Sequence, residues 1–116
     1  MTMDKEFLAR LDHPAHRQLY SHWCAQADPQ RLPGRQDLDL TSMRDLLPWI
    51  GEIEVTRAES RLQFRYRQTG KAIVKARGGD PSGRLFEELH QGVELTMIRL
   101  THIQIVAKKR PKLIEV

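Results

Sequence analysis

LPWIGEIEVTRAESRLQFRYRQTGKAIVKARGGDPSGR, residues 47–84, is the segment that decides the predicted fold. It begins with two alternating patterns. The first places Trp49, Ile53 and Val55 on one parity with Glu52 and Glu54 on the other, and the second alternates Leu62, Phe64 and Tyr66 with Gln63, Arg65 and Arg67. A period of two is typical of half-buried antiparallel strands with one dry face. We therefore predict strands over residues 49–56 and 61–68, joined by a hairpin at residues 57–60.

Helical patterns surround this hairpin, and we expect helices over residues 5–11, 12–27, 39–47, 71–76, 85–89 and 93–109. In the second of these, Asp12 is the expected N-cap, with Pro14 in the first turn. The last is apolar over more than half of its circumference, so we expect it to be buried against a sheet or a partner. Pro111 ends it, and residues 113–116 have the pattern of the start of a third strand. The order predicts an α+β fold, with a helical N-terminal extension over residues 1–46 and a domain over residues 47–116.

The composition is that of a globular chain with one hydrophobic core. No apolar run approaches the roughly 18 residues of a membrane span. The N-terminus mixes charge signs and lacks the apolar core of a signal peptide. The single cysteine, Cys24, excludes an internal disulfide and fits a reducing compartment. We therefore expect a cytoplasmic protein with no membrane contact.

The chain is moderately basic, with a formal net charge of +4 and a pI near 9.6. Its basic residues are spread among acidic ones, except for a cluster of Lys108, Lys109, Arg110 and Lys112. This cluster flanks a predicted helix end, where cations complement the exposed carbonyl groups. We favour that interpretation over a nucleic-acid surface. The alternative of a basic nucleic-acid-binding module stays open, and it predicts binding that weakens steeply with salt.

Several short motifs together resemble a bacterial PAS-like family, whose members are mostly small standalone proteins common in alphaproteobacteria. The resemblance covers about residues 16–90, and it depends on the order of motifs that are individually weak. Leu40 stands where the family usually has proline, and Lys71 where it usually has threonine. The motifs are Tyr20-x-x-Trp23, Leu32-Pro33-x-Arg35-x-Asp37-Leu38-Asp39, Leu46-Leu47-Pro48, Phe64-Arg65-Tyr66-Arg67-x-x-Gly70 and Gly79-Asp80-x-x-Gly83-Arg84.

The resemblance implies a five-stranded antiparallel sheet with short helices on one face, and a sensory or signalling function. Such domains hold a small molecule between sheet and helices, or dimerise. A complete sheet needs three more strands after the long helix, and residues 113–116 supply only the start of one. The resemblance places the last strand beside the first, so without it the first strand has unpaired backbone groups that invite another chain. We therefore expect a C-terminally truncated protein, or one completed by a strand-donating partner or a second copy. A stable, well-folded monomer in dilute solution would contradict this.

Two groups of residues are candidates for metal or haem ligands. His13, His16, His22 and Cys24 are the only cluster of metal-ligating types, but their spacing turns around a helix and lacks the tight pairing of zinc sites. Surface histidines and a half-buried cysteine are favoured instead, so no metal is predicted. His102 lies on the helix that faces the sheet in PAS folds, where some members bind haem through a histidine. A partly buried, hydrogen-bonded histidine is the favoured interpretation, and the cofactor is left undefined.

Catalysis has little support in the sequence. Residues 78–83, GGDPSG, lack the Gly-Lys-Ser/Thr ending of a phosphate loop, and no Ser-His-Asp order, paired carboxylates or His-Glu-x-x-His is present. Arg67 is either one member of a cross-strand charge pair with Glu52 or Glu54, which is favoured, or an anchor for an acidic ligand. We predict a non-enzymatic sensory module that binds a small ligand or a protein partner. The candidate ligand-binding residues are Phe64, Tyr66, Arg67, Ile73, Met97, Ile98 and His102.

Overall fold

The computed structural model describes residues 3–27, 31–34 and 37–114. The chain forms two compact units, one of residues 1–46 together with 113–116, and one of residues 47–112. The first is called the N-terminal unit and the second the hairpin unit, and each is described by itself. The 3-10 helix η2 (Leu40–Trp49) runs from the first unit into the second.

The N-terminal unit contains the helices α1 (Lys5–Arg10) and α2 (Pro14–Gln26), which lie close to their predicted positions. The Asp4 carboxylate caps α1 by accepting two backbone N–H bonds. The expected N-cap of α2 was wrong: Nδ1 of His13, not Asp12, accepts the N–H of Ala15 at 3.1 Å. The core consists of Leu11, Tyr20 and Cys24, with Met3, Phe7, Leu8, Trp23 and Leu113 packed against it.

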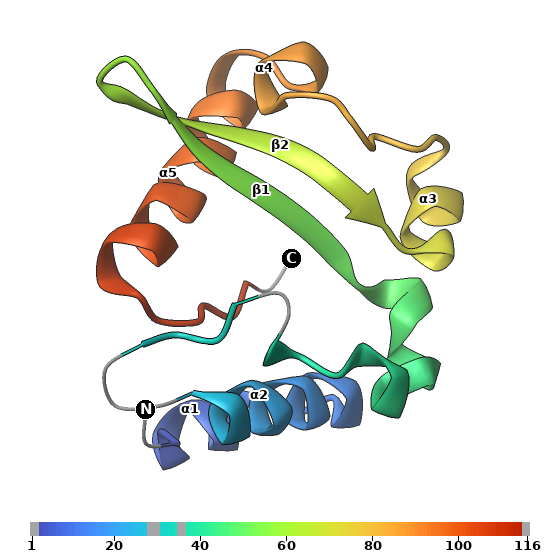
Figure 1. Ribbon diagram of the computed structural model, residues 1–116. Coiled ribbons are helices and arrows are strands. Elements are labelled where there is room, and N and C mark those ends of the chain that lie inside the picture. The colour runs from blue at the N-terminus through green and yellow to red at the C-terminus, as the bar shows by residue number, and fades with distance from the viewer. Residues whose placement is uncertain (1–2, 28–30, 35–36, 115–116) are drawn as a thin grey trace. The chain divides into compact units, whose positions relative to one another are not determined.

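The hairpin unit is built on β1 (Gly51–Ala58) and β2 (Arg61–Thr69), which pair antiparallel (Figure 1). The predicted hairpin is confirmed, and Val55 lies opposite Phe64 in its register. The first strand begins two residues later than predicted, since Trp49 still belongs to η2 and is exposed. Pro48 lies inside η2 rather than beyond its end, which a proline permits because its fixed φ suits a helical turn.

The predicted third strand is wrong for Leu113 and Ile114, which have no regular structure, whereas residues 115–116 lie outside the described part. The physical reason is that Leu113 packs into the core of the N-terminal unit. Residues 83–85, and not a third strand, form backbone hydrogen bonds with the edge of β2 that points away from β1. The N–H of Tyr66 donates to the Arg84 carbonyl at 2.9 Å, and the N–H of Gly83 donates to the Tyr66 carbonyl at 2.7 Å. Among the described residues, β1 pairs with β2 alone.

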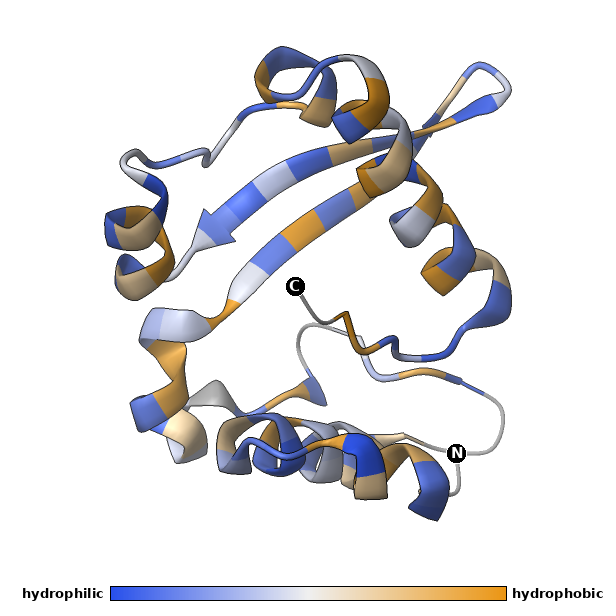
Figure 2. Cartoon of the chain, turned by 180° about the vertical axis from the view of Figure 1, so that it is seen from behind, coloured by the Kyte–Doolittle hydropathy of each residue, from blue (hydrophilic) through white to orange (hydrophobic). Residues whose placement is uncertain are grey.

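Three helices follow the hairpin: α3 (Lys71–Arg77), α4 (Phe86–Leu89) and α5 (Gly92–Lys108). They lie close to their predicted positions. Within the chain itself the longest helix is only partly covered, since no residue of α5 is buried, and the alternative that a partner covers it stays a prediction. Apolar residues occur along the whole of α5 (Figure 2), and only one side of the helix contacts the hairpin unit. The opposite side leaves Val93, Met97 and Leu100 exposed.

Candidate functional site

Five rings from β2, α4 and α5 meet on the dry face of the hairpin, and we call them the aromatic–imidazole cluster. Phe64 and Tyr66 are two residues apart on β2, so they share a face of the strand. The ring of Phe86 lies 5.3 Å from that of Phe64 and 5.0 Å from that of Tyr66. His102 of α5 lies 5.5 Å from Phe64 and 4.9 Å from Phe86, between ring centroids. The cluster comprises Phe64, Tyr66, Phe86, His90 and His102.

A chain of hydrogen bonds leads from this cluster to solvent. The Tyr66 hydroxyl lies 2.7 Å from Nε2 of His90, and Nδ1 of His90 lies 2.5 Å from a carboxylate oxygen of Glu94. Because an ionised carboxylate only accepts, Nδ1 donates to Glu94, and in the neutral form of the ring Nε2 then accepts from Tyr66. Burial raises the pKa of Tyr66, so its hydroxyl keeps its proton and acts as the donor at neutral pH.

Replacing Tyr66 with phenylalanine tests the worth of this hydrogen bond. The phenyl ring keeps the contact with Phe86, while Nε2 of His90 loses its donor. We expect the free energy of unfolding to fall by about 1 kcal/mol, the usual net value of one hydrogen bond. Urea denaturation followed by circular dichroism measures it. An unchanged midpoint would mean that water replaces the hydroxyl without loss.

Arg99 of α5 contacts both α4 and β2 at the border of the cluster. Its largely buried guanidinium donates to the Glu87 carboxylate at 3.0 Å and to the Leu62 carbonyl at 3.1 Å. It also lies over the ring of Phe64, 5.5 Å from the centroid. Sequence reasoning missed Arg99, Glu87, Phe86 and His90. The available signal was that Arg99 and His102 stand three residues apart and therefore share a helix face.

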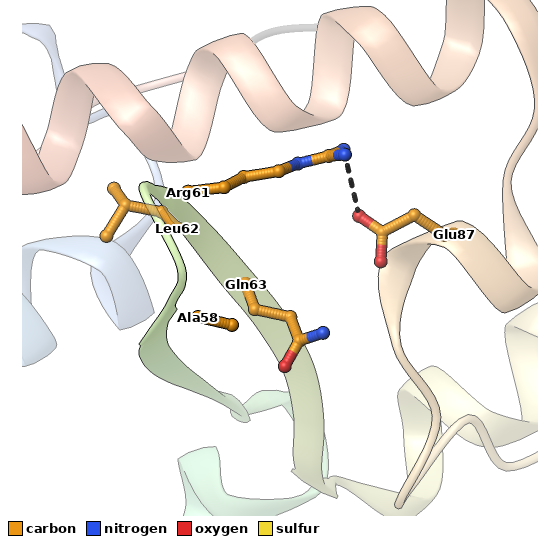
Figure 3. Close-up of a pocket in the computed structure, with 5 residues that line it drawn as sticks. All are labelled: Ala58, Arg61, Leu62, Gln63 and Glu87. Atoms are coloured by element: carbon orange, nitrogen blue, oxygen red, sulfur yellow. Dashed lines mark ion pairs between the residues drawn. The ribbon is translucent and has the colours of Figure 1, made fainter.

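A small pocket opens beside this ion pair, at the turn end of the hairpin (Figure 3). It is lined by Ala58, Arg61, Leu62, Gln63 and Glu87. The guanidinium of Arg61 lies 3.7 Å from the Glu87 carboxylate across the pocket. Its volume is about 130 Å³. Sites for small molecules usually measure about 300–1,000 Å³, so this pocket holds a few atoms and not a cofactor-sized ligand.

Only some of the predicted ligand-binding residues lie close to one another. Phe64, Tyr66 and His102 lie together in the aromatic–imidazole cluster. Arg67 stands on the other face of β2 and forms a 3.8 Å ion pair with Glu54, the cross-strand pair that the sequence favoured.

The other three candidates lie elsewhere on the helices. Ile73 is on α3, where its Cδ1 approaches Gly51 at the start of β1. On α5, Met97 is exposed and Ile98 is half-buried. The carbonyl of Ile98 accepts a 2.8 Å hydrogen bond from Nδ1 of His102.

The histidines and cysteine of the N-terminal unit have separate partners. The rings of His13 and His16 are 5.5 Å apart, and Nε2 of His22 accepts the N–H of Asp39 at 3.1 Å. Cys24 is buried in the core next to Tyr20. Within the described ranges, no three His, Cys, Asp or Glu side chains converge closely enough to hold a metal ion.

The basic cluster lies at the carboxyl end of α5, as predicted. Lys108 occupies the last turn, and Lys109 is the C-cap in the left-handed conformation. Lys112 donates to the Gln104 amide oxygen at 2.7 Å. In the part of the chain that the structure describes, no helix has the length and apolar character needed to cross a membrane.

Comparison with known proteins identifies one family. A family model described as a PAS domain matches residues 11–116, which is all but the first ten residues of the chain. The searches found no curated protein and no solved structure with significant similarity to this chain. The match includes both the hairpin and the helical segment before it.

Proposed function

The chain belongs to the PAS domain family, and we propose that this sensory or signalling module acts by accepting a strand from a protein partner at the outer edge of β1. This proposal makes the protein a binding module with no catalytic function. The observation that carries it is the pairing of β1, which among the described residues involves β2 alone.

The sequence of β1 supports strand addition. Native edge strands are usually protected by charged side chains, above all lysine, by proline or by a bulge. The charged side chains of β1 are Glu52, Glu54 and Arg57. Residues 51–58, GEIEVTRA, contain neither lysine nor proline, and the one irregularity falls at the start, between Glu52 and Ile53. The six residues that follow form about 20 Å of regular strand. Val55, in the middle of this stretch, is 42% exposed although its partner Phe64 is fully buried.

Two pockets lined wholly by residues that the structure describes bear on whether the partner is a protein or a small molecule. The pocket beside Glu87 measures about 130 Å³, and another near the end of α5, lined by Gln104, Ile105, Lys108, Arg110, Pro111 and Lys112, about 240 Å³. Both are smaller than the usual site for a cofactor or metabolite. The rings of the aromatic–imidazole cluster already contact one another, so a ligand there would have to displace them.

A synthetic peptide with the sequence of residues 51–58 serves as the probe strand. Added to the protein, it is expected to slow hydrogen exchange of the β1 amides that point away from β2. Val55→Lys should abolish this protection, because a lysine on the open edge opposes pairing. Ser60→Lys is the matched control, since it places the same charge in the exposed turn. Protection equal in both variants, or none with the natural chain, contradicts the proposal.

Ligand binding at the aromatic–imidazole cluster is the second candidate. It is supported by the position of three predicted wall residues, Phe64, Tyr66 and His102, in one apolar cluster. The remaining wall candidates of this version are Ile73, Met97 and Ile98, and Arg67 is its candidate anchor for an acidic ligand. Native mass spectrometry of the purified protein tests it: retention of a small molecule, lost in Phe64→Ala, supports the candidate. A mass equal to that of the polypeptide alone contradicts it.

A further inference from the structure

One side of α5 has the residue spacing of a helix–helix seam. Its members follow one another at steps of four, three, four and three, which average the 3.5-residue repeat of coiled coils. All are exposed, and the first three are large apolar residues at 79%, 59% and 47% exposure. We call this set the outer seam: Val93, Met97, Leu100, Gln104 and Ala107.

The outer seam is separate from the side of α5 that contacts the rest of the hairpin unit. That inner side uses Arg99 and His102, which contact Phe64. The three large apolar residues extend over about 10 Å of the solvent side of the helix and have no role in the core of this unit. It therefore fits an intermolecular contact.

We propose that the outer seam pairs with the outer seam of a second copy, with the two α5 helices antiparallel. This goes beyond the strand addition proposed above and uses a different surface. The choice of a second copy follows from charge. Residues 94, 101 and 108 follow the seam along one flank, and they are Glu94, Thr101 and Lys108. In an antiparallel pair this flank lies beside the same flank of the second copy, which runs in the opposite direction. Glu94 of each copy therefore lies next to Lys108 of the other, which gives one pair of opposite charges at each end of the contact.

The same register also pairs the seam residues of the two copies, apart from Val93, which faces a position beyond the end of α5. Met97 then lies opposite Ala107 of the second copy, and Leu100 opposite its Gln104. The Gln104 amide oxygen already accepts from Lys112, so its aliphatic stem can cover Leu100 without stranding that oxygen. Glu94 bonds His90 yet remains 71% exposed, which leaves acceptor capacity for a lysine.

A parallel pair lacks this complementarity. In a parallel pair, the flank with Glu94 and Lys108 lies beside the flank on the other side of the second copy's seam. That other flank begins before α5 and continues with Thr96 and Ile103. No opposite charges meet, since neither threonine nor isoleucine ionises. Charge therefore favours the antiparallel arrangement, as it does in coiled coils whose flanking positions set orientation.

Charge reversal gives a sharp test by analytical ultracentrifugation of the whole chain. Glu94→Lys and Lys108→Glu, each alone, are expected to weaken self-association about tenfold, because two exposed ion pairs become repulsive. A mixture of the two single variants should associate as well as the natural chain, since every flank then meets its opposite charge. The doubly reversed chain should also associate normally. Lys75→Glu on α3, an exposed lysine off the seam, is the control and should have no effect.

Two further outcomes separate this contact from pairing at β1. Leu100→Glu is expected to abolish association, with circular dichroism unchanged because the side chain is exposed. Association that survives Leu100→Glu but is lost in Val55→Lys overturns the seam proposal and leaves strand addition standing. A monomer at all concentrations, or single variants whose mixture fails to associate, also overturns it.

Discussion

Replacing Phe64 with alanine is expected to lower the free energy of unfolding by about 3–5 kcal/mol. Phe64 has no exposed surface and contacts rings from two helices as well as the Arg99 guanidinium. Truncation removes these contacts and leaves a cavity that the sheet and helices cannot close fully. Chemical denaturation monitored by circular dichroism measures the loss.

Val55→Ala is the matched control for this change. Val55 lies directly opposite Phe64 on the same face of the hairpin but is exposed. We expect a change below about 1 kcal/mol, because little apolar surface leaves water at this position on folding. Equal effects of the two substitutions would show that the dry face does not hold the hairpin to α4 and α5.

Gly70→Ala is the second change with a large expected effect, a loss of about 3 kcal/mol or more. A Cβ at Gly70 would overlap the carbonyl group of Pro48 and lie 2.5 Å from the carbonyl oxygen of Leu47. These are backbone atoms, so the end of η2 must move away from the end of β2. That movement would strain the 2.9 Å bond from the Gly70 N–H to the Ile50 carbonyl.

Gly51→Ala tests the specificity of that effect at the other strand of the same hairpin end. A Cβ there meets only ordinary contacts at 3.9 Å, from the Gln68 carbonyl oxygen and Ile73 Cδ1. We expect a neutral or slightly stabilising change, because alanine loses less backbone entropy than glycine on folding. Comparison of the two thermal midpoints is sufficient. A Gly70→Ala protein as stable as Gly51→Ala would refute the close approach.

Sensory modules transmit a signal by a change in contact, and the two proposed surfaces offer different routes for it. Strand addition at β1 would act on the sheet that carries Phe64. Pairing through the outer seam would act on α5, whose Arg99 reaches the Leu62 carbonyl of β2. Both surfaces therefore connect to the aromatic–imidazole cluster through residues that contact it.

The candidate site was only partly predictable. Phe64, Tyr66 and His102 were identified because strand parity and helix position indicate which side chains face the core. Phe86 begins a four-residue helix and His90 is its C-cap, and this helix is too short to show a periodicity that would assign them to a face. The Arg99–Glu87 pair joins residues twelve apart whose approach depends on the turn between α4 and α5.

Patterns within a few residues, or the order of short motifs, were enough to predict the hairpin, the order of the helices and the family. Three other features followed from packing: Trp49 lies outside the strand, Leu113 lies in the core of the N-terminal unit, and one side of α5 is exposed. The period of a hydrophobic pattern indicates which residues of a segment share one face. Which surface that face meets depends on segments far away in sequence, and packing alone settles it.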